Sequence, residues 1–285
     1  FQEAETVYRT ALQGMSGALG ATHPDTLGAM SGFVEVLKAS ARYEEAEVLS
    51  RQVYNSSARV FGRSHPETLT ACNNLSAMLK TIGKYEEAEA LSRKNLKVAD
   101  EVLGPLHDYT LVYAANLTRL LEDTGKFQDA ELMMRRELKA SEELHGPKSR
   151  AAIGSAMRLA GLLWALGEAS QALTLFQRTC KDSEETLGSD HPDTLVAIGN
   201  LAEVMRKSGR YDEALSLSRR CLQLSVSVLG PGHPETQVAM KNLEAVMTDM
   251  GRAQENLPPK LSLQQPKRLA KRVARPKRPT RPHAA

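Results

Sequence analysis

Glycines spaced 42 residues apart are the most constraining feature of this 285-residue chain. Six share one phase, and a histidine stands three residues after five of them; the glycines are Gly20, Gly62, Gly104, Gly146, Gly188 and Gly230. A second phase holds Gly83, Gly125, Gly167, Gly209 and Gly251, with Ala41 at the sixth place. A period of roughly 20 to 50 residues is typical of stacked supersecondary units, because no single unit can bury its apolar face alone. The chain is therefore predicted to form an elongated array.

Each unit has the sequence pattern of two antiparallel helices, as residues 65–104 illustrate. Pro66 fits the first turn of a helix, where a missing N–H leaves no hydrogen bond unmade. Leucine and methionine then recur at steps of three and four residues, which is the period of a helix. Gly83 ends this helix and Tyr85 begins a second one. The aromatic ring at that start is expected to wedge between the two helices, and Ala88, three residues later, is expected to let their backbones approach closely.

The repeat predicts an all-α chain of about six such pairs. The first helices are expected near residues 25–40, 67–82, 109–124, 151–166, 193–208 and 235–250. The second helices are expected near 1–19, 43–61, 85–103, 127–145, 169–187 and 211–229. The helix at 1–19 has no first helix before it, so Val7, Tyr8 and Leu12 are expected to face water. The array is therefore interpreted as fragmentary at the N-terminus. The last repeat is expected to fray, because a helix cannot continue through Pro258-Pro259.

The hairpin resembles a tetratricopeptide repeat. The 42-residue period with G-x-x-H-P-[DE]-T-L, N-L-A and G-[KR]-Y-x-E-A-E is similar to the pattern of kinesin light chains. The resemblance implies a right-handed superhelical solenoid in which the first helix of each pair lines the concave side. It also implies a role in binding proteins, since the groove of kinesin light chains takes short peptides with an aromatic residue set among acids. We expect residues 1–255 to form the repeat array and residues 256–285 a separate tail.

A column of asparagines is the candidate binding site. The resemblance implies that these positions face the groove; they are Asn74, Asn116, Asn200 and Asn242, with Arg158 and Gly32 at the two remaining places. An amide both donates and accepts, so it can hold the N–H and C=O groups of an extended peptide without reading its sequence. The alternative is that each asparagine only bonds a neighbouring helix. Arg119 and Arg206, a turn away, add positive charge, although mixed solvated charge is the simpler interpretation of that face.

The sequence offers no catalytic or metal-binding motif. It has no Gly-rich phosphate loop and no Gly-x-Ser-x-Gly motif, so we expect a non-catalytic protein without a cofactor. The repeated histidines stand in adjacent units about 20 Å apart, far beyond the span of one zinc site, and are expected to lie in loops or helix caps. Cys72, Cys180 and Cys221 fall inside predicted helices and are expected to be buried, reduced thiols.

The tail differs in charge from the rest of the chain. Residues 256–285 hold nine lysines and arginines and no acid, which leaves 28 bases against 34 acids elsewhere. Such a proline-rich, basic segment is expected to be disordered. A nuclear-import signal, a weak tether to an anionic polymer such as nucleic acid or a microtubule, and a solvated tail without a partner all fit it. No apolar run has membrane-spanning length, so we expect a cytoplasmic protein, or a nuclear one if the tail is an import signal.

The sequence thus predicts a non-catalytic scaffold that binds an extended peptide or a partner helix in a concave groove. Two other functions fit the same residues. The array could be an assembly module of a larger signalling protein, binding through its convex face or its ends, and the tail could tether the chain to an anionic polymer.

Overall fold

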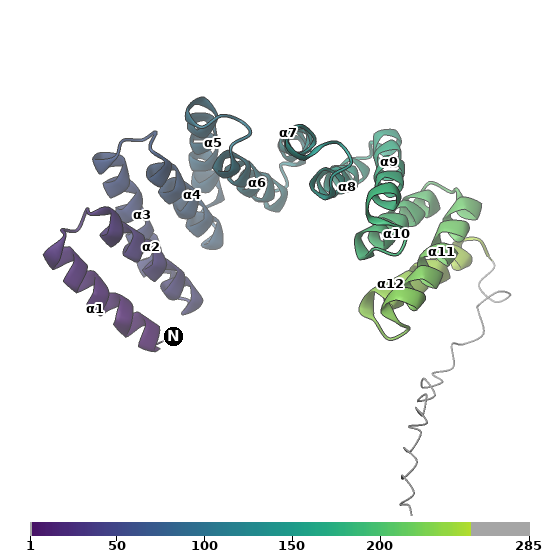
Figure 1. Cartoon of the computed structure of the whole chain (residues 1–285), viewed down its shortest axis with the longest axis horizontal. Helices are drawn as coiled ribbons and strands as arrows, with labels where there is room; N and C mark the ends of the chain where they lie inside the picture. The colour runs from purple at the N-terminus through teal and green to yellow at the C-terminus, as the bar shows by residue number, and fades with distance from the viewer. Residues whose placement is uncertain (1, 252–285) are drawn as a thin grey trace, which may run out of the picture.

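The computed structural model describes residues 2–251, which form twelve α-helices and no strands. The helices follow one another as an arch, with α1 at one end and α12 at the other (Figure 1). The predictions for residues 252–285, including the disorder and the partners of the tail, lie outside the described residues. The all-α solenoid predicted from the repeat is confirmed.

The helices alternate between the two sides of the arch. The even-numbered helices are α2 (Pro24–Ala39), α4 (Pro66–Thr81), α6 (Asp108–Asp123), α8 (Arg150–Ala165), α10 (Pro192–Lys207) and α12 (Pro234–Asp249). The odd-numbered helices are α1 (Gln2–Ala18), α3 (Tyr43–Val60), α5 (Tyr85–Val102), α7 (Phe127–His145), α9 (Ala169–Leu187) and α11 (Tyr211–Leu229). Each boundary falls within one residue of its predicted position.

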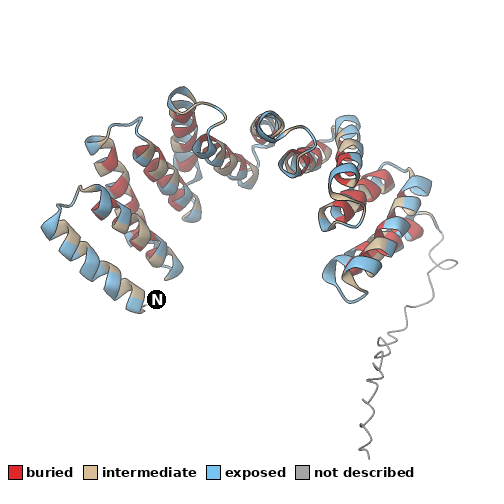
Figure 2. Cartoon of the chain, in the orientation of Figure 1, coloured by how far each residue is buried: buried red, intermediate tan, exposed pale blue. Residues whose placement is uncertain are grey.

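The even-numbered helices line the inner side of the arch (Figure 1). Besides the contacts between successive helices, α4 contacts α6 and α10 contacts α12, so inner helices of adjacent hairpins meet directly. Buried residues lie where helices face one another, and exposed residues lie on the outer surfaces and at the helix ends (Figure 2). This layering gives the chain a concave surface built from one helix of every hairpin.

The repeated histidines are helix caps, as predicted. In each of five repeats Nδ1 of the imidazole accepts a hydrogen bond from the backbone N–H two residues later, at 3.1–3.3 Å. The fourth repeat has Ser149 instead, and its Oγ accepts from the N–H of Ala152 at 3.2 Å. A side-chain acceptor here satisfies a backbone donor that the first helical turn leaves unpaired. The caps fix where every inner helix begins.

The turn between the two helices of a hairpin requires a left-handed residue. Gly83 has φ 79° at this turn, and the other four glycines of its phase are also positive. Ala41 occupies the equivalent place with φ 57°, although a side chain makes that conformation less favourable by roughly 1–2 kcal/mol. The first complete hairpin therefore contains a strained turn that the others avoid.

Ala41→Gly is expected to raise the free energy of unfolding by about 0.5–1 kcal/mol, because relief of the strain exceeds the added freedom of glycine in the unfolded chain. The shift in urea midpoint measures it. Gly83→Ala, the reverse change at the equivalent turn, should lower the midpoint. A lower urea midpoint for Ala41→Gly than for the unaltered chain would contradict the proposed backbone strain at Ala41.

Packing within a hairpin depends on one small residue. An alanine near the start of each odd-numbered helix from α3 to α11 has no exposed surface. These residues are Ala46, Ala88, Ala130, Ala172 and Ala214. The predicted close approach of the helix backbones is therefore confirmed. The predicted aromatic wedge is wrong, because Tyr43, Tyr85, Phe127 and Tyr211 are 36–42% exposed. Each ring stands at the first position of its helix and remains partly open to solvent.

The first helix is better packed than the sequence indicated. Of the three residues expected to face water, Val7 is 66% exposed, but Tyr8 and Leu12 pack against α2. The Tyr8 ring stacks on Phe33 with centroids 6.0 Å apart, and a Cβ added at Gly32 would stand 2.6 Å from the Tyr8 hydroxyl. The asparagine column is therefore interrupted at Gly32 because Tyr8 takes up the space of a side chain.

Ion pairs join the outer helices of successive hairpins. Glu47 accepts from Arg51 of its own helix at 2.9 Å and from Lys84 at the next turn at 2.6 Å, and Arg51 also reaches Glu87 of α5 at 2.6 Å. The hydrogen bond from Lys84 holds the pKa of Glu47 below its ordinary value. The arrangement recurs one hairpin later in the contacts of Glu89 with Arg93 and Lys126.

Candidate functional site

The four asparagines and Arg158 of the predicted column all lie on inner helices, as does Gly32. Asn74, Arg158 and Asn200 are exposed, while Asn116 and Asn242 are half-buried. The side-chain amides of Asn74, Asn200 and Asn242 have no hydrogen-bond partner within residues 2–251. Gaps lie between neighbouring inner helices, and the outer helices α3 and α11 contribute to the lining of the first and the fifth gap. The first gap lies between α2 and α4, the second between α4 and α6, the third between α6 and α8, and the fifth between α10 and α12.

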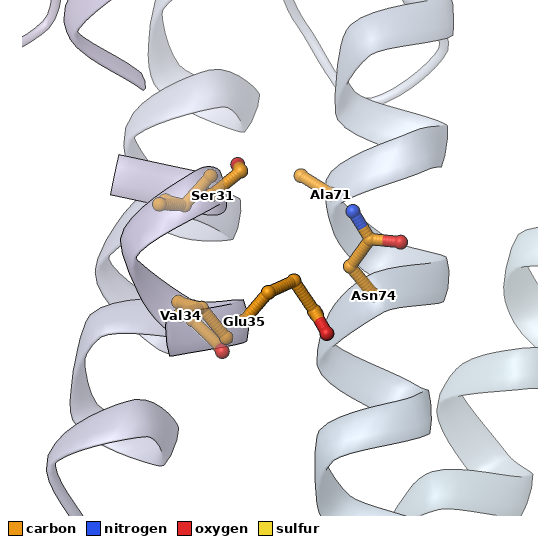
Figure 3. A pocket seen from close by; sticks show the side chains of 7 residues that line it. Ser31, Val34, Glu35, Ala71 and Asn74 are labelled. Carbon is orange, nitrogen blue, oxygen red and sulfur yellow. The ribbon is translucent and has the colours of Figure 1, made fainter. Parts of the chain in front are cut away.

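The first gap contains an open pocket of about 170 Å³. Asn74 lines it, together with the apolar side chains of Leu27, Val53 and Phe61, and Glu67 lies at its edge. Further along the same gap, Asn74 and Ala71 of α4 face Ser31, Val34 and Glu35 of α2 (Figure 3). The asparagine thus stands beside an apolar depression of the inner surface.

The fifth gap contains an equivalent pocket of about 310 Å³. It is formed by the same repeat positions and includes both Asn200 and Asn242. Its apolar lining is Leu195, Val196, Cys221, Leu229, Val238 and Ala239. Asp193 and Glu235 provide carboxylates, and the residues lining the pocket include no base. The two ends of the groove therefore carry pockets of one design.

Tyr113 fills the second gap. It is 3% exposed and stands where the neighbouring repeats have Ala71 and Ser155. Its hydroxyl lies 3.0 Å from Oγ1 of Thr70 on α4. In this gap Nδ2 of Asn116 donates to Oδ1 of Asn73 at 2.9 Å. The sequence left open the alternative that each asparagine only bonds a neighbouring helix. The N–H₂ group of Asn116 forms such a bond.

Arg158 is held in the third gap by carboxylates of its own chain. Its Nη1 donates to Glu137 of α7 at 3.0 Å, and Nη2 lies 3.7 Å from Glu122 of α6. Glu137 also accepts from Thr118 at 2.6 Å. Arg158 therefore bridges three helices, and its charge is largely balanced before any ligand arrives.

The other two predicted arginines differ from each other. Arg206 donates to Glu203 at 2.7 Å and also pairs with Asp249 of α12. Its hydrogen bond lowers the pKa of Glu203. Arg119 is exposed and forms no ion pair within the described chain. Because most groove bases are paired with acids, the mixed-charge interpretation describes this face better than a net positive one.

Sequence reasoning missed the residues that close the middle gaps. Tyr113 breaks a position otherwise held by alanine or serine, so aligning the repeats on their glycines would have singled it out. Asn73 and Glu137 carry no such signal, because their partners come from the next repeat and depend on how adjacent hairpins are set against each other.

The described residues hold no group of three or more potential metal ligands. The three cysteines are buried and unpaired, and burial raises the pKa of Cys72 to about 12 and of Cys180 to about 11. High thiol pKa values disfavour the reactive thiolate at neutral pH. Within residues 2–251 every helix falls short of the length and apolarity needed to cross a membrane.

Comparison with known proteins identifies the repeat. The tetratricopeptide repeat family model matches residues 29–94, 67–143, 152–224 and 195–255. Nearly identical TPR-like repeats of a candidate kinesin light chain from Podosopora anserina are similar at 21% identity and TM-score 0.64, covering 72% of this chain and 97% of that one. BtubC (BKLC) from P. vanneervenii is similar at 16% identity and TM-score 0.64, covering 82% and 93%. RapI in its apo form is similar at 14% identity and TM-score 0.67, covering 87% and 65%.

A comparison with curated protein sequences finds no match. The likeness to the solved structures shows the fold, in agreement with the layered helical pairs and the concave inner surface. The family model covers more than half of the chain, in overlapping segments that follow the 42-residue period. The chain belongs to the tetratricopeptide repeat family.

Proposed function

We propose that the concave groove captures an extended segment of a protein partner. The observation that carries this proposal is the position of three asparagines with unpaired side-chain amides, Asn74, Asn200 and Asn242, at open pockets of the inner surface. Amides can pair with the N–H and C=O groups of a passing backbone, while the pockets beside them accept its side chains. Pairing with the backbone supplies affinity, and the pockets supply selectivity.

The remaining predicted residues take different parts in this proposal. Asn116 offers its Oδ1 as an acceptor, since its N–H₂ is held by Asn73. Arg119 is the exposed cation available to a ligand carboxylate. Arg158 and Arg206 join inner helices to their neighbours through their contacts with Glu137 of α7 and Asp249 of α12. A rigid scaffold of this kind loses little conformational entropy on binding, which favours affinity for a flexible peptide.

Asn200→Leu combined with Asn242→Leu is expected to weaken capture at least about fivefold. Two lost backbone contacts at about 0.5–1.5 kcal/mol each give that factor. The probe is a peptide enriched from a displayed library of random dodecapeptides on the full chain, and its Kd is measured by fluorescence anisotropy. Leucine favours helix, so circular dichroism should stay unchanged.

The matched control is Asn55→Leu, an exposed asparagine on the outer helix α3. It should leave the Kd unaltered. Equal Kd values for all three proteins would rule out the groove and favour binding through the convex face or the ends of the arch, as expected of an assembly module.

A further inference from the structure

We propose that a basic segment of this same chain, residues 267–275, occupies the pocket of the fifth gap, with Leu269 in its apolar interior. The inference rests on the proposed function, because it assigns the groove a ligand of defined chemistry. That ligand is an apolar side chain flanked by lysine and arginine, the opposite charge from the acidic peptides suggested by the resemblance to kinesin light chains.

The pocket has an apolar interior and an acidic edge. Val196 and Val238 are 41% and 49% exposed, so apolar surface that could be covered is open to solvent here. The volume of about 310 Å³ is at the lower end of small-ligand pockets, which span roughly 300–1,000 Å³. Glu235 is exposed and forms no ion pair within the described chain, while Asp193 bonds Arg150 at 2.6 Å. An uncompensated carboxylate thus stands beside uncovered apolar surface.

The sequence beyond α12 carries the complementary groups. Residues 267–275 read Lys-Arg-Leu-Ala-Lys-Arg-Val-Ala-Arg, so Leu269 stands between two pairs of bases. No acid occurs in residues 256–285 to compete with Glu235 for these bases. Burial of Leu269 lowers the free energy in proportion to the apolar area that is removed from water. The flanking bases add electrostatic attraction to the carboxylates at the edge of the pocket.

The chain is long enough to reach this pocket. The pocket lies along the first half of α12, from Glu235 to Asn242, and α12 has 16 residues, or about 24 Å. Leu269 comes eighteen residues after Gly251 and can lie up to about 60 Å from it along an extended path. Tethering also raises the effective concentration of the segment to roughly the millimolar range, so a weak contact is sufficient.

A cation of α12 opposes the contact and provides a test. Lys241 of α12 is exposed, and it is not among the residues that line the pocket. Lys241→Glu should therefore strengthen the contact and Glu235→Lys should weaken it. The two substitutions alter the net charge of the chain in opposite directions at neighbouring sites.

Cysteine pairing in the full chain measures the contact. Leu269→Cys with Val238→Cys in the pocket is expected to form a disulfide within one chain at least about tenfold faster than the control pair. The control is Leu269→Cys with Ser216→Cys, an exposed position near the start of the outer helix α11. The control site also lies near the C-terminal end of α12. Arg206 at the end of α10 pairs with Asp249 at the end of α12, and α11 begins at Tyr211, shortly after α10 ends. Because native Cys221 also lines this pocket, both pairs are compared in a Cys221→Ala background, while Cys72 and Cys180 are buried elsewhere.

The expected response to charge is specific. Glu235→Lys should slow formation of the Leu269→Cys–Val238→Cys disulfide several-fold, Lys241→Glu should accelerate it, and about 1 M salt should slow it, because the Debye length falls to about 3 Å. Equal rates for the two cysteine pairs, or disulfides only between two chains at every dilution, would overturn the proposal. Indifference to both charge substitutions would overturn it as well.

A peptide measurement separates this inference from the proposed function. If the tail occupies the pocket, Leu269→Asp should raise the affinity of the library-selected peptide several-fold by removing a competitor. If the peptide binds through the asparagines but is indifferent to Leu269→Asp, the inference fails and the proposed function stands. If the disulfide forms as expected while the Asn200→Leu/Asn242→Leu variant keeps full affinity for the peptide, the proposed function fails and the tail contact stands.

Discussion

Tyr113→Ala is expected to lower the free energy of unfolding by about 3–5 kcal/mol, the range for removing a buried aromatic side chain. The ring is 3% exposed and fills the second gap, and its hydroxyl lies 3.0 Å from Thr70. The loss combines the transfer of the ring to water with the cavity left between α4 and α6. Because the neighbouring repeats have alanine or serine here, the variant should also open a pocket like those of the first and fifth gaps.

Urea unfolding followed by circular dichroism measures the change. Tyr113→Phe is the control, since it keeps the ring and removes only the contact with Thr70, for an expected loss of about 1 kcal/mol. If the alanine variant were as stable as the phenylalanine variant, the ring would not be filling the gap. A crystal structure of the alanine variant would show whether the pocket opens or the helices close over it.

Ala88→Leu is expected to lower the free energy of unfolding by about 1–3 kcal/mol, as overpacking of a tight interface does. Ala88 has no exposed surface, and its carbonyl oxygen accepts a hydrogen bond from Ser76 of α4 at 2.9 Å. The two helix backbones are therefore too close for three additional carbon atoms. The hairpin must either separate or rotate to admit them.

Ala90→Leu makes the same chemical change two residues further along α5, where the side chain is exposed. Its stability should stay within about 0.5 kcal/mol of the unaltered chain, as is usual for surface substitutions. Thermal unfolding of the two variants side by side gives the comparison. Similar melting temperatures for both would mean that the interface around Ala88 has room to spare.

The fold was predictable because its signals are local. Helix caps such as His65 and turns such as Gly83 act over a few residues, so the period located the helix boundaries within one residue. The period also placed the asparagines on the first helix of each pair, while the resemblance to tetratricopeptide repeats implied that this helix faces the concave side. In each case the physical cause is contained within a single hairpin.

The state of the groove was less predictable, because it depends on contacts between hairpins. Charge counting could not show that Arg206 bonds Glu203 and Asp249, since Asp249 lies a full repeat away. The aromatic wedge failed for a related reason: the repeat pattern does not show how much of the ring at the first position of an outer helix is covered by its neighbours, and Tyr85 stays 39% exposed. Ion-pair partners and ring burial can be identified only when the relative positions of adjacent repeats are known.

Contacts between neighbouring hairpins join residues that are close in sequence. Tyr113 meets Thr70 over 43 positions, and Lys84 meets Glu47 over 37. Short loops are closed at a small entropic penalty, and chains dominated by local contacts fold rapidly. Each repeat can therefore pack against its neighbour once that neighbour has been synthesised. The arch can assemble progressively, without waiting for the C-terminus to be made.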